Sequence, residues 1–275
     1  MAGDSAERDL SWLDGTLTPV LTPDGKQLLF QEWGEGGGSL ATAYMRRADG
    51  RPPVRLSEGG PFGVTKDGRW ALIIAGPAWQ RELRMVPTGA GEAYTLPRGP
   101  IAQVFLAFLS PDEKHVVTVG CETGKPLRYW VQELPSGLPR PFGPDEVRWA
   151  WGCPTPDGRW WLICPPGQPA PGLLYPVDGG EPRSVKGLQV DDDPVRWSDD
   201  ARWLYVQIPD RLPLPVTRID TSTGRREPWL TLSPPDMAGV SSEGLWLSTL
   251  TPDGRYYAYD YVRALSCLYL VTGVR

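Results

Sequence analysis

The nine residues Thr22-Pro-Asp-Gly-Lys-Gln-Leu-Leu-Phe30 decide the fold, because the same pattern occurs six times in the chain. Two further copies read Thr65-Lys-Asp-Gly-Arg-Trp-Ala-Leu-Ile73 and Thr155-Pro-Asp-Gly-Arg-Trp-Trp-Leu-Ile163. The remaining copies begin at Ser110, Ser198 and Thr251, so that successive copies start 43, 45, 45, 43 and 53 residues apart. A repeat of this period indicates a stacked or radial array of similar units.

Each copy has the chemistry of a tight hairpin turn, since Pro presets φ, Asp caps its own backbone and Gly adopts the left-handed conformation. Apolar runs after the turns, such as residues 27–30 and 256–259, predict buried strands. Third strands are expected at residues 43–46, 173–177 and 216–220, and fourth strands at 53–56, 182–185 and 227–230.

Four antiparallel strands per repeat are typical of a propeller blade. The sequence therefore predicts an all-β, six-bladed β-propeller. We expect a tail at residues 1–8 and one domain at 9–275, with blades at residues 16–58, 60–98, 102–144, 146–188, 191–236 and 239–275. Residues 9–13 are expected to pair with 267–271, complete the last blade and close the ring, because an open sheet edge is a liability.

Charge and hydropathy exclude two classes of partner. The net charge of −5 and a pI near 5.1 leave no basic stripe for a nucleic-acid backbone. The longest nearly apolar run, residues 101–109, is too short to span a bilayer. We expect a monomer with no nucleic-acid partner, no membrane segment and no cofactor.

The four cysteines show no Cys-x-x-Cys spacing, so the sequence predicts no metal site. Cys153 and Cys164 flank one of the hairpin turns. The turn is expected to place Cys153 near Trp161 and Cys164 on the opposite face of the sheet. A disulfide between them is the less favoured alternative, because it requires close, facing Cβ atoms.

Three segments give a more specific resemblance. The blades are similar to those of TolB-type, WD-repeat-like bacterial propellers. Residues 7–15 (Glu-Arg-Asp-Leu-Ser-Trp-Leu-Asp-Gly), 173–183 and 266–275 resemble the C-terminal propeller region of bacterial serine/threonine protein kinases. This resemblance implies a sensor or interaction module that follows a kinase domain. No kinase motif occurs in these 275 residues, so no kinase residue can be carried over.

Catalytic signatures are weak, and we predict no catalytic residues. The single histidine, His115, begins an apolar run that is typical of a strand. A chain with one histidine cannot form a three-His metal site, and it has one candidate base for a Ser-His-Asp triad. No Gly-x-Ser-x-Gly elbow is present. Trp70, Trp160, Trp161 and Trp203 follow hairpin turns, so most of them are expected in the core.

The best candidate for a ligand site is the mouth of the central channel. Residues 191–193 (Asp-Asp-Asp) are expected to open the innermost strand of blade 5, where calcium is one alternative and a solvated turn the favoured one. Aromatic residues beside charged ones suit a peptide or glycan. We define the channel-mouth surface by five residues: Arg148, Trp151, Asp191, Asp193 and Trp246.

These features favour a non-enzymatic sensor or interaction propeller that binds a protein, a peptide or a small ligand. The rival hypotheses are a propeller hydrolase, the gating propeller of a serine peptidase, and a periplasmic assembly scaffold of the TolB kind. The identity of the ligand and the cellular compartment stay open at this point.

Overall fold

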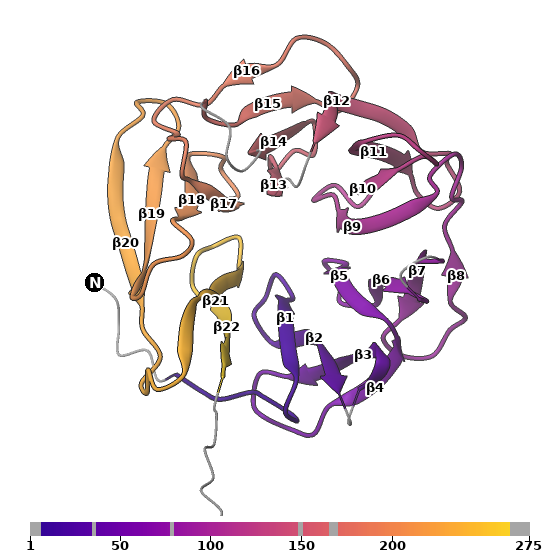
Figure 1. Cartoon of the computed structure of the whole chain (residues 1–275), viewed down its shortest axis with the longest axis vertical. Coiled ribbons are helices and arrows are strands. Elements are labelled where there is room, and N and C mark those ends of the chain that lie inside the picture. Colours follow the sequence, from indigo (N-terminus) through magenta and orange to yellow (C-terminus); the bar gives the residue numbers. More distant parts are fainter. Residues whose placement is uncertain (1–6, 35–36, 78–79, 148–150, 165–169, 265–275) are drawn as a thin grey trace, which may run out of the picture.

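The computed structural model describes residues 7–34, 37–77, 80–147, 151–164 and 170–264. In these residues every regular element is a strand, and the strands form six antiparallel sheets arranged in a ring (Figure 1). The prediction of an all-β, six-bladed propeller is confirmed. The described residues contain no helix with the length and hydrophobicity that a membrane span requires.

Each sheet is a meander in which strands consecutive in sequence are neighbours. Blade 1 contains β1 (Thr16–Leu21), β2 (Gln27–Gly34), β3 (Gly38–Arg47) and β4 (Val54–Glu58). Blade 2 contains β5 (Gly60–Val64), β6 (Trp70–Ala75), β7 (Glu82–Pro87) and β8 (Tyr94–Thr95). Blade 3 contains β9 (Gln103–Leu109), β10 (His115–Cys121), β11 (Leu127–Glu133) and β12 (Arg140–Val147).

Blade 4 contains β13 (Trp151–Pro154), β14 (Trp160–Cys164), β15 (Leu173–Pro176) and β16 (Arg183–Ser184). Blade 5 contains β17 (Asp193–Trp197), β18 (Trp203–Gln207), β19 (Leu214–Asp220) and β20 (Arg226–Leu232). The described part of blade 6 contains β21 (Val240–Leu250) and β22 (Tyr257–Arg263). The first strand of each blade lies nearest the centre of the ring (Figure 1).

The repeated turn is held by one set of hydrogen bonds. In the first copy the Thr22 hydroxyl donates to Asp24 Oδ1 at 2.7 Å, and it accepts from Gln27 N at 3.1 Å. Asp24 Oδ1 also accepts from Lys26 N at 3.0 Å. The same Ser/Thr–Asp contact recurs in the other five turns. The turn motif therefore determines where each inner hairpin begins.

Two of the turns lack glycine and still adopt its conformation. Gly25 has a φ of 67°, and Gly68 has a φ of 70°. The equivalent residues of the third and fifth turns are Glu113 and Ala201, whose φ values are 59° and 56°. The hairpin geometry thus imposes a left-handed backbone conformation at this position. Glycine adopts it readily, whereas residues with a side chain, apart from Asn and Asp, rarely do.

Apolar clusters fill the seams between consecutive blades from blade 1 to blade 6. In the seam between blades 3 and 4, for example, Phe108 packs edge-on against Trp161 with ring centroids 5.5 Å apart. Trp161 is fully buried, as expected for a core tryptophan, whereas Trp70, Trp160 and Trp203 are only partly buried. Radial packing of this kind is the main source of burial in a propeller.

The first and last blades meet through β1, which contacts both β21 and β22. Arg46, on β3, holds the chain that precedes β1: its Nη1 donates to Leu10 O at 2.8 Å. Glu32, on β2, accepts from Leu13 N at 3.2 Å. This segment passes β21 and β22 on its way to β1 (Figure 1). Burial, and secondly the nearby Glu7 carboxylate, raises the pKa of Tyr259 on β22.

The predicted pairing of residues 9–13 with 267–271 stays a prediction. Residues 267–271 lie outside the described part of the chain. Residues 9–13 belong to no sheet of the described residues, although they are fixed to blade 1.

Candidate functional site

Asp193 is the first residue of β17 and pairs in register with Gln207 of β18. Gln207 Nε2 donates to Asp193 Oδ2 at 3.0 Å. Burial raises the pKa of Asp193 to about 6, and the hydrogen bond from Gln207 opposes this shift. No described residue forms an ion pair with the Asp193 carboxylate. A half-buried acid on the innermost strand of blade 5 thus has no counter-ion among the described residues.

Gln207 links this acid to the next blade. Its Oε1 accepts the backbone N–H of Leu247 at 2.9 Å, so one carboxamide bridges Asp193 on blade 5 and β21 on blade 6. Leu247 follows Trp246, which pairs with Asp260 of β22 and is partly buried. The structure therefore brings Asp193 and the strand position of Trp246 together across the seam.

The three consecutive aspartates diverge. Asp191 is exposed. The buried Asp192 receives Arg226 at 2.6 Å and 2.8 Å, and it also accepts from Gln189 N. Asp193 points instead toward Gln207. In the described residues no group of three His, Cys, Asp or Glu side chains is placed to hold a metal ion. The calcium alternative is therefore disfavoured, because the central carboxylate is already paired.

The two remaining members of the channel-mouth surface belong to blade 4 and its approach. Arg148 lies outside the described residues. Trp151 is the first residue of β13 and pairs with Cys164, and its side chain is likewise outside the description. The inner strands β13, β17 and β21 contact one another in sequence. The backbones that carry Trp151, Asp193 and Trp246 thus lie on three consecutive blades.

A second, half-buried acid on β22, where blade 6 meets blade 1, is not foreseen from the sequence. Asp260 accepts from the Ser248 hydroxyl and from the backbone N–H of Thr18, which belongs to blade 1. Burial raises its pKa, and both hydrogen bonds oppose that rise. Gln207 and Asp260 each lie nine residues after the Ser or Thr that opens their turn. A polar residue at this position of an apolar strand is the signal that could have identified both.

The sequence-based placement of the cysteines is wrong by one residue. Thr155 N bonds to Trp160 O and closes the turn, so Cys153 lies opposite Leu162 and not Trp161. Side chains alternate along a strand, which places Cys164 on the same face as Cys153. Both are free thiols. Burial raises the pKa of Cys153 well above its ordinary value and that of Cys164 to about 12, so neither is a ready nucleophile.

His115 begins β10, as expected for a strand residue, and it sits beside a turn that contains Ser110 and Asp112. Its Nδ1 lies 3.3 Å from Asp112 Oδ2, and Ser110 donates to the other oxygen of that carboxylate. In a hydrolytic triad the imidazole stands between the acid and the hydroxyl. Here the acid stands in the middle, and the Ser–Asp contact is the one shared by all six turns.

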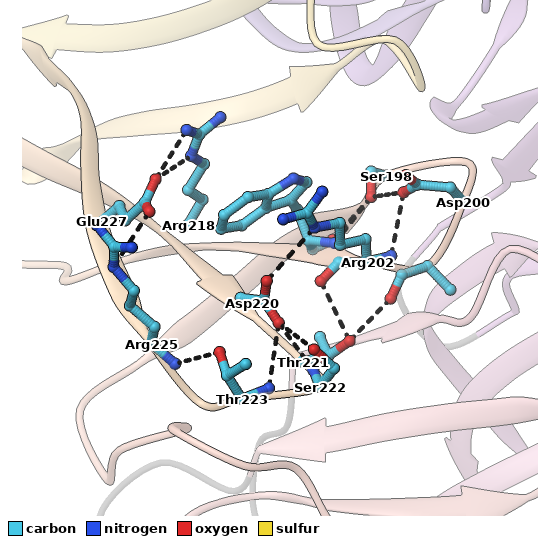
Figure 2. Close-up of polar contacts among 12 residues, drawn as sticks. Ser198, Asp200, Arg202, Arg218, Asp220, Thr221, Ser222, Thr223, Arg225 and Glu227 are labelled. Atoms are coloured by element: carbon cyan, nitrogen blue, oxygen red, sulfur yellow. Dashed lines mark hydrogen bonds and ion pairs between the residues drawn. The ribbon is translucent and has the colours of Figure 1, made fainter.

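A charged and aromatic cluster on blade 5 is structural rather than open to a ligand (Figure 2). The guanidinium carbons of Arg202 and Arg218 lie 5.1 Å and 4.2 Å from the centroid of the Trp203 ring. Arg218 forms two hydrogen bonds to Glu227, and Arg202 lies 3.4 Å from Asp220. Both cations are therefore paired, and hydrogen bonds from residues 222 and 223 keep the pKa of Asp220 well below its usual range.

Comparison with known proteins identifies the fold alone. No protein-family model and no curated protein sequence matches the chain. Among solved structures, the Agrobacterium tumefaciens protein described as TolB is 18% identical, with 91% of each chain covered and a TM-score of 0.66. TolB from Acinetobacter baumannii is 15% identical with a TM-score of 0.60, and the alignment covers 80% of this chain but only 56% of that protein.

Enzymes share the same architecture. The oligogalacturonate lyase from Vibrio parahaemolyticus is 16% identical, with 85% of this chain and 67% of the lyase covered and a TM-score of 0.59. The fold therefore resembles TolB-type propellers, and similarity at this level does not transfer an activity.

Proposed function

We propose that the chain is a non-enzymatic binding propeller whose channel-mouth surface receives a protein segment, a peptide or a small ligand. The observation that carries the proposal is the Asp193 carboxylate, which is half-buried, has a raised pKa and has no counter-ion among the described residues. Such a group weakens the folded state and is typical of functional sites. A ligand with an amine or guanidinium group would supply the missing charge.

The surroundings of Asp193 support a cationic ligand with an apolar or aromatic part. Asp191 adds a second, exposed carboxylate two residues away. Trp246 precedes Leu247 on β21, but side chains alternate along a strand, so its ring lies on the face toward blade 1, whereas Leu247 packs in the seam with blade 5. An indole ring attracts cations through its π face, so a ligand that spans the inner edge of blade 6 would combine charge with cation–π attraction.

A role as the accessory domain of a bacterial serine/threonine kinase is the more specific part of the proposal. It rests on the resemblance of residues 7–15, 173–183 and 266–275 to kinase-associated propellers. An antibody against the propeller, used on cells that express the native gene, should capture a polypeptide whose tryptic peptides include kinase motifs. Capture of a polypeptide without such motifs would contradict the kinase link and favour a free-standing scaffold.

Selection from a displayed peptide library tests the binding role. We expect enriched peptides to carry Lys, Arg or a free amino group, and to lose binding to the Asp193→Asn and Trp246→Ala variants. Tyr256→Ala is the matched control, because Tyr256 is 53% exposed beside the turn of the same blade. Enrichment of peptides that bind all four proteins equally would place the site elsewhere.

The enzymatic alternative is tested with the same protein. A propeller hydrolase of the triad type would depend on His115, the single histidine. We expect the parent protein and the His115→Gln variant to bind the selected peptides equally well. Neither protein should cleave them. Cleavage of a selected peptide that disappears in this variant would overturn the non-enzymatic assignment.

A further inference from the structure

Asp260, on β22, is a second carboxylate that no cation neutralises. Its side chain is half-buried, and it forms no ion pair within the described residues. Its two hydrogen-bond donors, the Ser248 hydroxyl and the Thr18 N–H, are both neutral. A carboxylate accepts about four hydrogen bonds, so Asp260 keeps both its charge and part of its acceptor capacity for a ligand.

Both donors are exposed residues of innermost strands. Ser248 belongs to β21 and Thr18 to β1, and these strands border the centre of the ring on blades 6 and 1 (Figure 1). Each residue lies in a bulge of its strand, where it has no register partner on the neighbouring strand of its own blade. A bulge redirects the chain, so both donors are turned toward Asp260 instead of their own ladder. The carboxylate therefore lies at the inner surface of the ring.

The backbone at Thr18 is strained where it meets this carboxylate. Its φ of 51° lies in the left-handed region, which β-branched residues rarely adopt. The conformation directs the N–H of Thr18 to Asp260 across the seam between blades. Strained backbone of this kind is concentrated at binding sites and in switches. The strain thus supports a functional role for the contact.

Trp246 lies beside Asp260. The two residues are opposite each other in register on β21 and β22, so their side chains share one face of blade 6. Residues opposite each other on antiparallel strands have Cβ atoms about 5 Å apart. The shared face is the one toward blade 1, because Asp260 contacts Thr18 there. An indole ring next to a carboxylate attracts a cation through both its π face and the negative charge.

Strand β21 separates Asp260 from Asp193. On one side the Leu247 N–H bonds to Gln207, which also holds Asp193. On the other side the next residue, Ser248, donates to Asp260. The two carboxylates therefore belong to adjacent sheets, and stacked sheets pack about 10 Å apart. A flexible ligand with two cationic groups at this spacing would reach both.

We propose that Asp260 is a second cation site and that the ligand of the channel-mouth surface is a linear aliphatic dication. The inference rests on the proposed function, because Asp193 receives the first positive charge. One ammonium group binds at Asp193, the other binds at Asp260 beside Trp246, and the methylene chain crosses the inner edge of β21. A free diamine and a pair of lysines in a peptide share this chemistry.

Titrations with hexylamine, 1,6-diaminohexane and the peptide acetyl-Lys-Gly-Lys-amide test the proposal. The amide NMR signal of Leu247 reports on the Asp193 side, and that of Thr18 reports on the Asp260 side. We expect the diamine to shift both signals and to bind at least about tenfold more tightly than hexylamine, because its second charge binds intramolecularly. The peptide separates the two sources: tighter binding than the diamine assigns the charges to a protein segment, and weaker binding assigns them to a free diamine.

Asp260→Asn separates this inference from the proposed function. The asparagine keeps an oxygen that accepts hydrogen bonds, so the variant should fold, and thermal unfolding verifies this. We expect its affinity for the diamine to fall to that for hexylamine, while the shift of the Leu247 signal by hexylamine stays unchanged. Asp145→Asn is the matched control, because it removes the same charge from a side chain that is 100% exposed on blade 3. It should bind the diamine as the parent protein does.

The outcomes distinguish the two proposals. Equal affinity of the parent protein for the diamine and hexylamine, a Thr18 signal that does not move at saturation, or an equal loss in Asp145→Asn would overturn the second site and leave Asp193 in place. The Thr18 signal of the parent protein decides the question if Asp260→Asn does not fold. If Asp260→Asn abolishes amine binding and Asp193→Asn leaves it unchanged, the role of Asp193 is wrong and Asp260 is the cation site. No saturable binding of any probe would overturn both proposals.

Discussion

The Oε1 atom of Gln207 accepts the backbone N–H of Leu247 at 2.9 Å, and this hydrogen bond joins blade 5 to blade 6. Asp260 occupies the equivalent position in blade 6 and accepts the N–H of Thr18 in blade 1. In blade 1 the equivalent residue is Gln31, and the residue it would contact in blade 2 is Pro61, which has no N–H. The polar contact therefore occurs where the neighbouring strand offers a donor.

Gln207→Leu should lower the free energy of unfolding by about 1–3 kcal/mol, because the buried Leu247 N–H loses its acceptor and Asp193 loses its donor. Gln31→Leu is the matched control and should change it by less than about 1 kcal/mol. Urea denaturation measures both. Equal losses in the two variants would show that the inter-blade hydrogen bond contributes nothing specific.

The stability of the protein should fall between about pH 4 and pH 6 because of Asp193. Its folded pKa of about 6 lies above the ordinary value of 3.8. The neutral acid therefore favours the folded state below pH 3.8, and this contribution is lost as the pH rises through 6. Asp193→Asn should raise the free energy of unfolding by up to about 3 kcal/mol at pH 8, and by much less at pH 4.

Urea denaturation of both proteins across this pH range checks the expectation. The asparagine keeps an oxygen that can accept from Gln207 Nε2, so that the substitution removes the charge and spares the hydrogen bond. If Asp193→Asn is less stable than the parent protein at both pH 4 and pH 8, the Asp193 carboxylate stabilises the folded state and the expectation is wrong.

Closure of the ring by residues 9–13 and 267–271 is tested by paired deletions. Removal of residues 1–14 also removes the hydrogen bonds that Leu10 forms with Arg46 and Leu13 forms with Glu32, so it should lower the melting temperature by several degrees. Removal of residues 266–275 should do the same. If the two segments pair, the double deletion should cost less than the sum of the single deletions. Additive losses, or a melting temperature unchanged by the first deletion, would contradict the closure.

Relief of the left-handed conformation at Ala201 should stabilise the protein. Ala201→Gly is expected to raise the free energy of unfolding by about 1 kcal/mol, because glycine adopts a positive φ without steric penalty. Gly68→Ala is the reverse change at the same turn position, where an added Cβ would meet no atom closer than 3.6 Å. It should lower stability by a similar amount, and thermal unfolding measures both. A loss in both variants would contradict the role assigned to this turn position.

The fold was predictable from sequence because turn chemistry repeats in it. The Ser/Thr–Asp hydrogen bond depends on two residues that are two positions apart, and such local interactions are visible in the sequence. The same locality explains the error at Cys153. Register depends on which residue pair closes the turn, and a change of one residue moves a side chain to the other face of the sheet.

The candidate site was less predictable because its contacts cross between blades. The position of Asp193 at the start of an inner strand follows from the repeat, but its contact with Gln207 and the link to Leu247 do not. The pairing of Asp192 with Arg226 joins residues 34 positions apart, and no sequence motif announces it.

The central claim is that Asp193 is a binding group for a cationic ligand. Its most direct test is the pKa of the Asp193 carboxylate, measured by ¹³C NMR with and without a peptide from the displayed-library selection. A bound cation stabilises the charged form, so the pKa should fall from about 6 toward the ordinary 3.8. A pKa that stays near 6 while the peptide is bound would contradict the account.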